Sequence, residues 1–211
     1  MPGSPYGRAV LATLIEKDAP CRVVAVPPES IRKEPHISRH PFGRVPVLEH
    51  DGFVLYETQA MVRYVDRAVP GKPLTPQDIR AAARMDQIMN ISDWYLFHGV
   101  NSVIGFQRIV GPRVLSLSPD EAAIAAAKPK AHKVFRELER LLGTNEFLAG
   151  SQLSLADMMA VTQLDLLSET PEWAALTAET PNLVSWLARM NARKSLKETT
   201  WEKVNLLARA A

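Results

Sequence analysis

The sequence predicts an α/β domain followed by an all-helical domain. Short apolar and β-branched runs bounded by turn residues lie in the first third of the chain, at 22–26, 45–49 and 53–56. A turn-rich run, Pro-Gly-Lys-Pro-Leu-Thr-Pro, follows at 70–76. Beyond it apolar residues recur at helical spacing in almost every segment. The composition therefore changes sharply at one place, which is where a domain boundary is expected.

We expect the first domain to cover residues 1–67, the linker 68–76 and the helical domain 77–211. No internal repeat or low-complexity segment interrupts this division. A chain of 211 residues is long enough for either one domain or two, and for a hydrophobic core without disulfide bonds.

The first domain is expected to alternate helices and strands. Apolar residues at helical spacing predict a helix over 7–17. The run 22–26 is a predicted strand, which Pro27-Pro28 ends because proline cannot donate to a ladder. Residues 30–38 are polar and are expected to be irregular, with about one helical turn.

A hairpin and a helix complete the first domain. The dipeptide Asp51-Gly52 supplies the positive φ angles of a tight turn between the two strands. A helix is expected to open at Glu57-Thr58, with the apolar residues Ala60, Met61, Tyr64 and Val65 on one face.

The second part of the chain has clear helix signals. A long helix is predicted over 77–99, with Met85, Ile88, Met89 and Leu96 on one stripe. Ser118-Pro119-Asp120-Glu121 is a predicted capping box that opens a further helix. That helix is expected to kink or break near Pro129 and to resume over 131–142, where Gly143 ends it.

Another capping box is predicted at Ser154 and Asp157, in which the aspartate takes the place of the usual glutamate. It opens the next helix of the helical domain, and Leu153 and Met158 are placed to pack against each other across it.

Composition and charge exclude several classes of protein. A net charge of +2, with Lys and Arg scattered along the chain, does not indicate a nucleic-acid partner. No window approaches the roughly 18 apolar residues of a membrane span, and the start has no apolar signal core. The single Cys21 excludes a disulfide framework and fits a reducing compartment. We therefore expect a soluble cytoplasmic protein with no membrane partner.

Two neighbouring segments suggest a ligand. A helix start at Glu57-Thr58 carries unpaired N–H groups and a partial positive charge, which suit a carboxylate. The backbone of Val45, next to Pro46, can pair with an extended peptide as an added strand would. A site that holds both a peptide backbone and a carboxylate suggests a small acidic peptide.

These segments resemble the glutathione S-transferases, with a bacterial or phi-like character. The run from His40 to Glu49 is similar to the family signature N-P-F-G-[KQ]-V-P-x-[LF]-E, and 57–61 to E-[ST]-x-A-I. Residues 4–10 resemble S-P-Y-x-R-x-V, residues 154–157 the S-x-A-D motif, and residues 181–190 the late P-x-L-x-x-W-x-x-R-M helix. The resemblance covers nearly the whole chain in the right order.

The resemblance implies a thioredoxin-like N-terminal domain and a helical-bundle C-terminal domain. It implies a transferase that uses glutathione as co-substrate, without a metal, and attacks a small hydrophobic electrophile with the glutathione thiolate. It also implies a homodimer and a role in detoxification. Related reactions of the same site are peroxidase, dehalogenase or disulfide reductase chemistry. A member without catalysis, serving in binding or protein interaction, is the alternative of another class.

Ser4 is the residue that the resemblance implies for thiol activation. A free thiol has a pKa near ~8.5, and a hydroxyl donating to sulfur at a helix start favours the thiolate. Ser4 before Pro5 is also an ordinary helix cap. Tyr6 offers an alternative hydroxyl.

The resemblance assigns further residues to glutathione. The Val45-Pro46 bond is expected to be cis and to present Val45 to the cysteinyl part. Glu57 and Thr58 are expected to hold the γ-glutamyl end, although ordinary capping explains them too. The other glutathione-binding residues are Arg32, Arg44, Val45 and Pro46.

Some of these assignments depart from the family pattern. A solvated basic loop explains Arg32 and Lys33 nearly as well as a contact with the glycyl carboxylate does, and Ile31 stands where the family often has histidine. The electrophile pocket is expected at Trp94, Phe97 and His98, for which a core stripe is the alternative.

The sequence lacks the segment for one strand that the resemblance implies. The central strand of a thioredoxin-like domain should precede Ser4, and only three residues do so. We expect a wrong or shortened start rather than a rearranged fold. Cys21 is interpreted as a buried structural cysteine, and His36 and His40 as surface residues.

Overall fold

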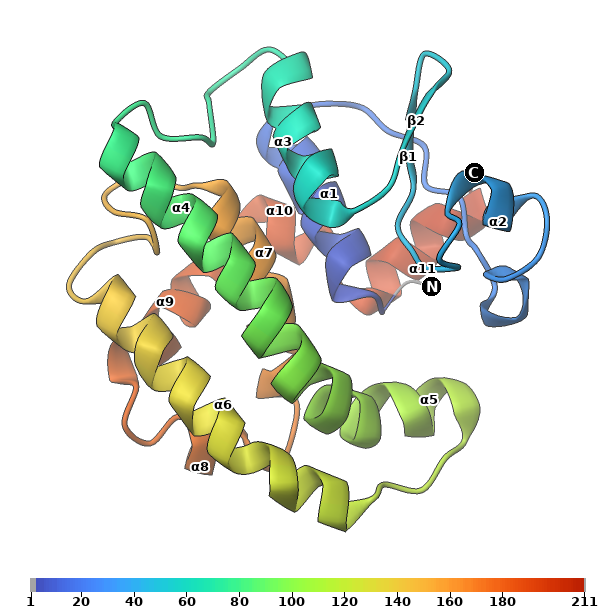
Figure 1. Ribbon diagram of the computed structural model, residues 1–211. Helices are drawn as coiled ribbons and strands as arrows, with labels where there is room; N and C mark the ends of the chain where they lie inside the picture. The colour runs from blue at the N-terminus through green and yellow to red at the C-terminus, as the bar shows by residue number, and fades with distance from the viewer. Residues whose placement is uncertain (1–2, 211) are drawn as a thin grey trace. The chain divides into compact units, whose positions relative to one another are not determined.

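The computed structural model describes residues 3–210 (Figure 1). Met1, Pro2 and Ala211, where the two expected domains begin and end, lie outside the described residues. The contacts divide the chain into two compact units, one of 1–73 with 193–211 and one of 74–192. No helix in the described part is both long and apolar enough to cross a membrane.

Unit 1 contains a small hairpin and helices. Its elements are α1 (Pro5–Glu16), η1 (Pro28–Ser30), α2 (His36–Arg39), β1 (Leu48–His50), β2 (Phe53–Leu55), α3 (Thr58–Ala68), α10 (Lys194–Lys197) and α11 (Trp201–Ala210). Helices α1 and α3 pack against each other, and α10 packs against α1. The buried apolar residues of α1 and α3, including Ala9, Val10, Met61 and Val65, form the core of this unit.

The predicted hairpin is present. Strands β1 and β2 pair antiparallel, with Leu48 opposite Leu55 and His50 opposite Phe53. Asp51 and Gly52 have φ angles of 50° and 79°, so both turn residues are left-handed as this two-residue turn requires. The hairpin stands out as the narrow pair of strands in Figure 1.

The predicted strand at 22–26 is wrong. In the described residues the sheet consists of β1 and β2 alone, and 22–26 forms no ladder. A strand is stabilised by backbone pairing with a neighbour, and no strand lies between α1 and the start of the described chain to provide it. The run has the apolar pattern of a strand, but no segment in the described part of the chain pairs with it.

Unit 2 is helical. Its elements are α4 (Ile79–Ile91), the π-helical η2 (Ser92–Val110), α5 (Gly111–Leu115), α6 (Glu121–Leu142), α7 (Leu155–Ser168), α8 (Trp173–Leu176) and α9 (Pro181–Asn191). Helix α7 is buried along almost its whole length and forms the centre of this unit. Helix α6 packs against η2 and α9, and η2 also contacts α7.

The long first helix of unit 2 was predicted to end at Gly99, and this prediction is wrong. Helix continues from α4 through η2 and α5 to Leu115. The buried stripe that begins with Met85 and Ile88 continues at Val100 and Ile104. Burial of these side chains outweighs the cost of about 1 kcal/mol for a glycine inside a helix.

Of the kink or break expected near Pro129, the break is wrong, because α6 is one helix with the proline inside it. The kink stays a prediction. Buried residues on both sides of the proline, such as Ala127 and Ala131, hold the two halves in place. Its N-cap is Asp120, whose carboxylate accepts the Ala123 N–H at 3.0 Å, and not Ser118. Gly143 ends the helix as predicted, with φ 53°.

Candidate functional site

The turn before β1 is held by side chains from α2 and the segment before it. The His36 ring nitrogen Nε2 lies 2.7 Å from the carbonyl oxygen of Arg44. Gly43 has φ 57°, and a Cβ added there would lie 2.9 Å from Cγ of Arg32. The structure therefore brings Arg32 and Arg44 to the same turn. The Val45-Pro46 bond that follows is cis, as expected.

The start of α3 has an unusual backbone. Its N-cap Glu57 has φ 68°, and no side chain caps the helix among the described residues. A non-glycine residue in this region costs of order 1–3 kcal/mol and is maintained only when its surroundings hold it. Glu57 is exposed and Thr58 is buried. The positive end of the helix dipole and an exposed carboxylate are therefore displayed together.

An aromatic cluster joins α2 to this helix start. The His40 and Tyr56 rings are 4.9 Å apart at 35°, and Phe42 meets Tyr56 edge-on at 6.1 Å. Tyr56 directly precedes Glu57. His40 and His36 are 3% and 7% exposed, so their interpretation as surface residues is wrong. Their ring contacts bury them although the local sequence is polar and rich in proline.

Burial also sets the charge of His40. Desolvation lowers the pKa of the ring, while the Glu57 carboxylate works in the opposite direction and His36 and Arg44 reinforce the decrease. Its Nδ1 is buried and has no hydrogen-bond partner in the described residues. The neutral ring is therefore the favoured form near neutral pH.

Ser4 lies where helix capping places it. Its side chain accepts the Gly7 N–H at 3.2 Å, and its carbonyl accepts the Arg8 N–H at 3.0 Å. The hydroxyl acts as an acceptor in this bond, which leaves its proton able to donate to another group. The alternative hydroxyl, Tyr6, is half-buried on the first turn of the same helix.

One aromatic residue beside this turn, Trp201, was not among the residues predicted from the sequence. A Cβ added at Gly3 would lie 1.7 Å from the ring of Trp201, so the indole packs directly against the residue before Ser4. Trp201 begins α11, which belongs to unit 1 although nearly 200 residues separate it from Ser4. No local motif marks this contact.

Trp94, Phe97 and His98 cluster on η2 in unit 2. The Trp94 and His98 rings are 5.7 Å apart, and those of Phe97 and His98 are 5.4 Å apart. Trp94 is 68% exposed, whereas Leu96 beside it is fully buried. The core position in this run thus belongs to Leu96, and the Trp94 and His98 side chains are available to a ligand.

Cys21 is exposed, so its interpretation as a buried residue is wrong. Neighbouring groups nevertheless remove water from around the sulfur and raise the pKa of the thiol. A raised pKa means less thiolate at neutral pH, which disfavours a nucleophilic role.

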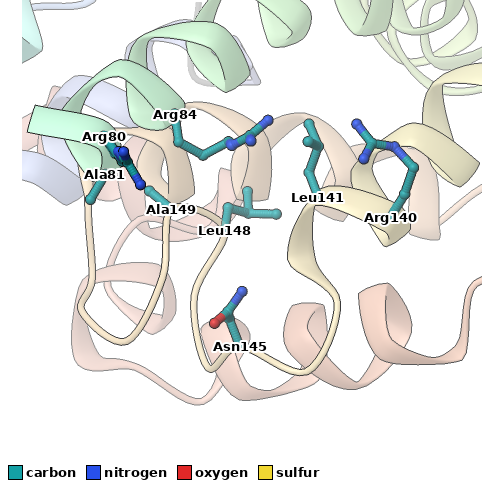
Figure 2. A pocket seen from close by; sticks show the side chains of 8 residues that line it. All are labelled: Arg80, Ala81, Arg84, Arg140, Leu141, Asn145, Leu148 and Ala149. Carbon is teal, nitrogen blue, oxygen red and sulfur yellow. The ribbon is translucent and has the colours of Figure 1, made fainter.

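A separate pocket of about 360 Å³ lies in unit 2 (Figure 2). Three guanidinium groups and the Asn145 amide surround an apolar floor; its lining residues are Arg80, Ala81, Arg84, Arg140, Leu141, Asn145, Leu148 and Ala149. None of the residues that the sequence nominated lines it.

Comparison with known proteins identifies the family. Residues 1–73 match the model of the glutathione S-transferase N-terminal domain, and residues 89–194 that of the C-terminal domain. The chain belongs to the glutathione S-transferase family. Its fold is accordingly the thioredoxin-like N-terminal domain with a helical C-terminal domain that the sequence predicted.

Individual relatives agree over nearly the full length. Glutathione S-transferase hmp2 of Hypomyces subiculosus is 30% identical over 97% of this chain and 98% of its own. A glutathione S-transferase of Hyoscyamus muticus is 31% identical over 90% of each. The structure of glutathione S-transferase-I bound with lactoylglutathione has a TM-score of 0.82, 25% identity and 93% coverage of both chains.

Proposed function

We propose that this chain is a glutathione transferase, whose glutathione site lies between the Val45-Pro46 turn and the start of α3. This proposal rests mainly on two structural features, the turn before β1 and the start of α3, which the aromatic cluster of His40, Phe42 and Tyr56 joins. A backbone segment suited to a peptide precedes β1, and α3 begins at Glu57 with an exposed carboxylate and without a side-chain cap from the described part of the chain. Full-length similarity to glutathione S-transferases supports the same reaction.

Each part of glutathione has a matching group in this arrangement. The backbone N–H and C=O of Val45 pair with the cysteinyl residue, as in strand addition. Glu57 and Thr58 hold the amino and carboxylate groups of the γ-glutamyl end. Arg32, whose side chain lies beside Gly43, and Arg44, the residue after Gly43, attract the glycyl carboxylate.

The chemical step is nucleophilic attack by sulfur. The Ser4 hydroxyl donates a hydrogen bond to the thiolate and, with the N-terminus of α1, favours the charged form. A sulfur–carbon bond forms at the electrophile, and in a substitution the leaving group departs with the electron pair of its broken bond. Trp94, Phe97 and His98 supply apolar and aromatic surface for a small hydrophobic electrophile. We also propose that this conjugation serves detoxification and that the protein acts in the cytoplasm.

A non-catalytic, glutathione-binding member is the second candidate. The observation that favours it is the bond from Gly7 N–H to Ser4, which is the bond of an ordinary helix cap. Retention on immobilised glutathione together with conjugation of a chlorodinitrobenzene would identify the transferase. Retention without conjugation would identify the second candidate.

The first test of the site is Glu57→Gln, with Glu57→Ala as a second variant. Loss of the charge-assisted contact, worth roughly 1.5–3 kcal/mol, should weaken glutathione binding about tenfold or more in calorimetry. Glu29→Ala, an exposed acidic residue of the same unit, is the control and should bind like the unaltered protein. Unchanged binding by both Glu57 variants would exclude this placement of the γ-glutamyl group.

We also propose that the chain forms a homodimer. The long helical run of unit 2 carries an exposed aromatic residue, Tyr95, that is compatible with an interface. Light scattering coupled to size exclusion should give about twice the chain mass of 23.4 kDa. A monomer that persists at micromolar concentration would contradict the dimer without affecting the glutathione site.

A further inference from the structure

His40 occupies an unusual position for a titratable side chain. It ends the short α2, and its backbone N–H donates to the His36 carbonyl at 2.9 Å. Its carbonyl accepts the Gly43 N–H at 2.8 Å. The residue therefore belongs to the framework that leads into the Val45 turn, while its ring faces the segment that precedes α3.

The ring of His40 packs against the residue next to the strained Glu57. Tyr56 is in contact with both His40 and Phe42, at 4.9 and 6.1 Å between ring centroids. A positive φ at Glu57 requires support from its neighbours. This aromatic packing is the support visible on the N-terminal side of Glu57, and on the other side its carbonyl accepts the Met61 N–H at 3.0 Å.

The surroundings of His40 fit a neutral ring and not a charged one. His36 on α2, Arg44 on the turn and Glu57 at the start of α3 are the charged or titratable groups that act on it. Two of the three are basic. The ring is almost completely buried, and Nδ1 has no acceptor in the described residues, so a proton there would remain unpaired.

We propose that His40 is a positioning residue of the glutathione site: its neutral ring holds the Tyr56–Glu57 backbone so that the start of α3 meets the γ-glutamyl end. The inference rests on the proposed function. It adds that the site loosens when His40 gains a proton, because burial disfavours the cation and Nδ1 has no acceptor in the described residues, although the Glu57 carboxylate attracts the charge. Glutathione affinity should then fall in acid before the fold is lost.

The test compares His40→Ala, His40→Asn and His40→Phe. Phenylalanine keeps a flat ring against Tyr56 and cannot titrate. We expect His40→Ala and His40→Asn to bind glutathione roughly two- to tenfold more weakly at pH 7.5, the range expected for loss of an aromatic pair. His40→Phe should bind like the unaltered protein at pH 7.5 and keep more of its affinity at pH 5.5. His132→Ala, a histidine of unit 2, is the control.

A second measurement does not require glutathione. Amide hydrogen exchange at 56–61 should be faster in His40→Ala than in the unaltered protein, and near the unaltered rate in His40→Phe. Equal exchange and equal glutathione affinity in His40→Ala would overturn the inference while leaving the proposed function intact. Faster exchange in a protein that does not bind glutathione would support the positioning role and reject the proposed function.

Discussion

The hydroxyl of Ser4 can serve the first helix and a bound thiol at the same time. It accepts one hydrogen bond from Gly7 and still has its own proton to donate. The two interpretations that the sequence left open are therefore compatible with each other. Only the titration of a bound thiol separates a cap from an activator.

Ser4→Ala should raise the pKa of bound glutathione and slow conjugation, with little change in glutathione affinity. Each pKa unit corresponds to 1.36 kcal/mol, so a charge-assisted hydrogen bond gives a shift of about one to two units. The measurement is the ultraviolet absorbance of the bound thiolate against pH in both proteins. Coincident curves would make Ser4 a helix cap only, and Tyr6 would be the next residue to alter.

At the scale of an element, the start of α7 shows what burial does to a capping box. The Asp157 carboxylate accepts bonds from the Leu148 and Ser154 N–H groups, both at 2.9 Å, and from Trp186 Nε1 at 3.0 Å. Burial raises the pKa of Asp157, and these hydrogen bonds oppose that increase. The box predicted from sequence is present, and it also joins α7 to α9 and to the preceding loop.

Asp157→Ala should therefore destabilise the protein by about 3–5 kcal/mol, because several buried donors lose their acceptor. Asp120→Ala is the matched control, since Asp120 caps α6 at an exposed position and its loss should cost about 1 kcal/mol. Urea denaturation of both variants gives the comparison. If both variants lose the same free energy of unfolding, the additional hydrogen-bond partners of Asp157 contribute little to stability.

At the scale of the whole molecule, the last helices, α10 and α11, are part of unit 1 together with the first helix, α1. Glu16 at the end of α1 accepts two hydrogen bonds from Arg193, at 2.9 and 2.7 Å, and one from Ser195. Arg8 donates to the Leu196 carbonyl at 3.2 Å. These polar contacts join residues about 180 positions apart and fasten 193–199 to α1 within unit 1.

Glu16→Gln should lower stability by about 2 kcal/mol at neutral pH and expose the C-terminal segment to limited proteolysis. Burial opposes ionisation of Glu16, but hydrogen bonds from Arg193 and Ser195 outweigh it and lower its pKa. Ionised Glu16 therefore stabilises the folded protein fully above the ordinary pKa of a glutamate, and this stabilisation is lost as pH falls through the lowered pKa. The difference in melting temperature between variant and parent should shrink in acid, and a constant difference would contradict this linkage.

Local patterns were sufficient for much of the fold. The Asp51-Gly52 turn, the helix start after Glu57, the Gly143 stop and the Ser154–Asp157 box each depend on backbone geometry within a few residues. Such signals are readable because the interaction that they describe closes over a short stretch of chain. The division of the chain into domains and the site residues remain predictions.

The sequence by itself determined the family, the Asp51-Gly52 hairpin, the helix that follows Glu57 and the capping box at the start of α7. Only the tertiary structure decided that 22–26 has no strand partner within 3–210, that helix continues past Gly99, and that His36 and His40 are buried. The reason is physical. Strand pairing, helix continuation across a glycine and burial of a polar ring depend on surfaces contributed by other elements, and those surfaces exist only after the chain has folded.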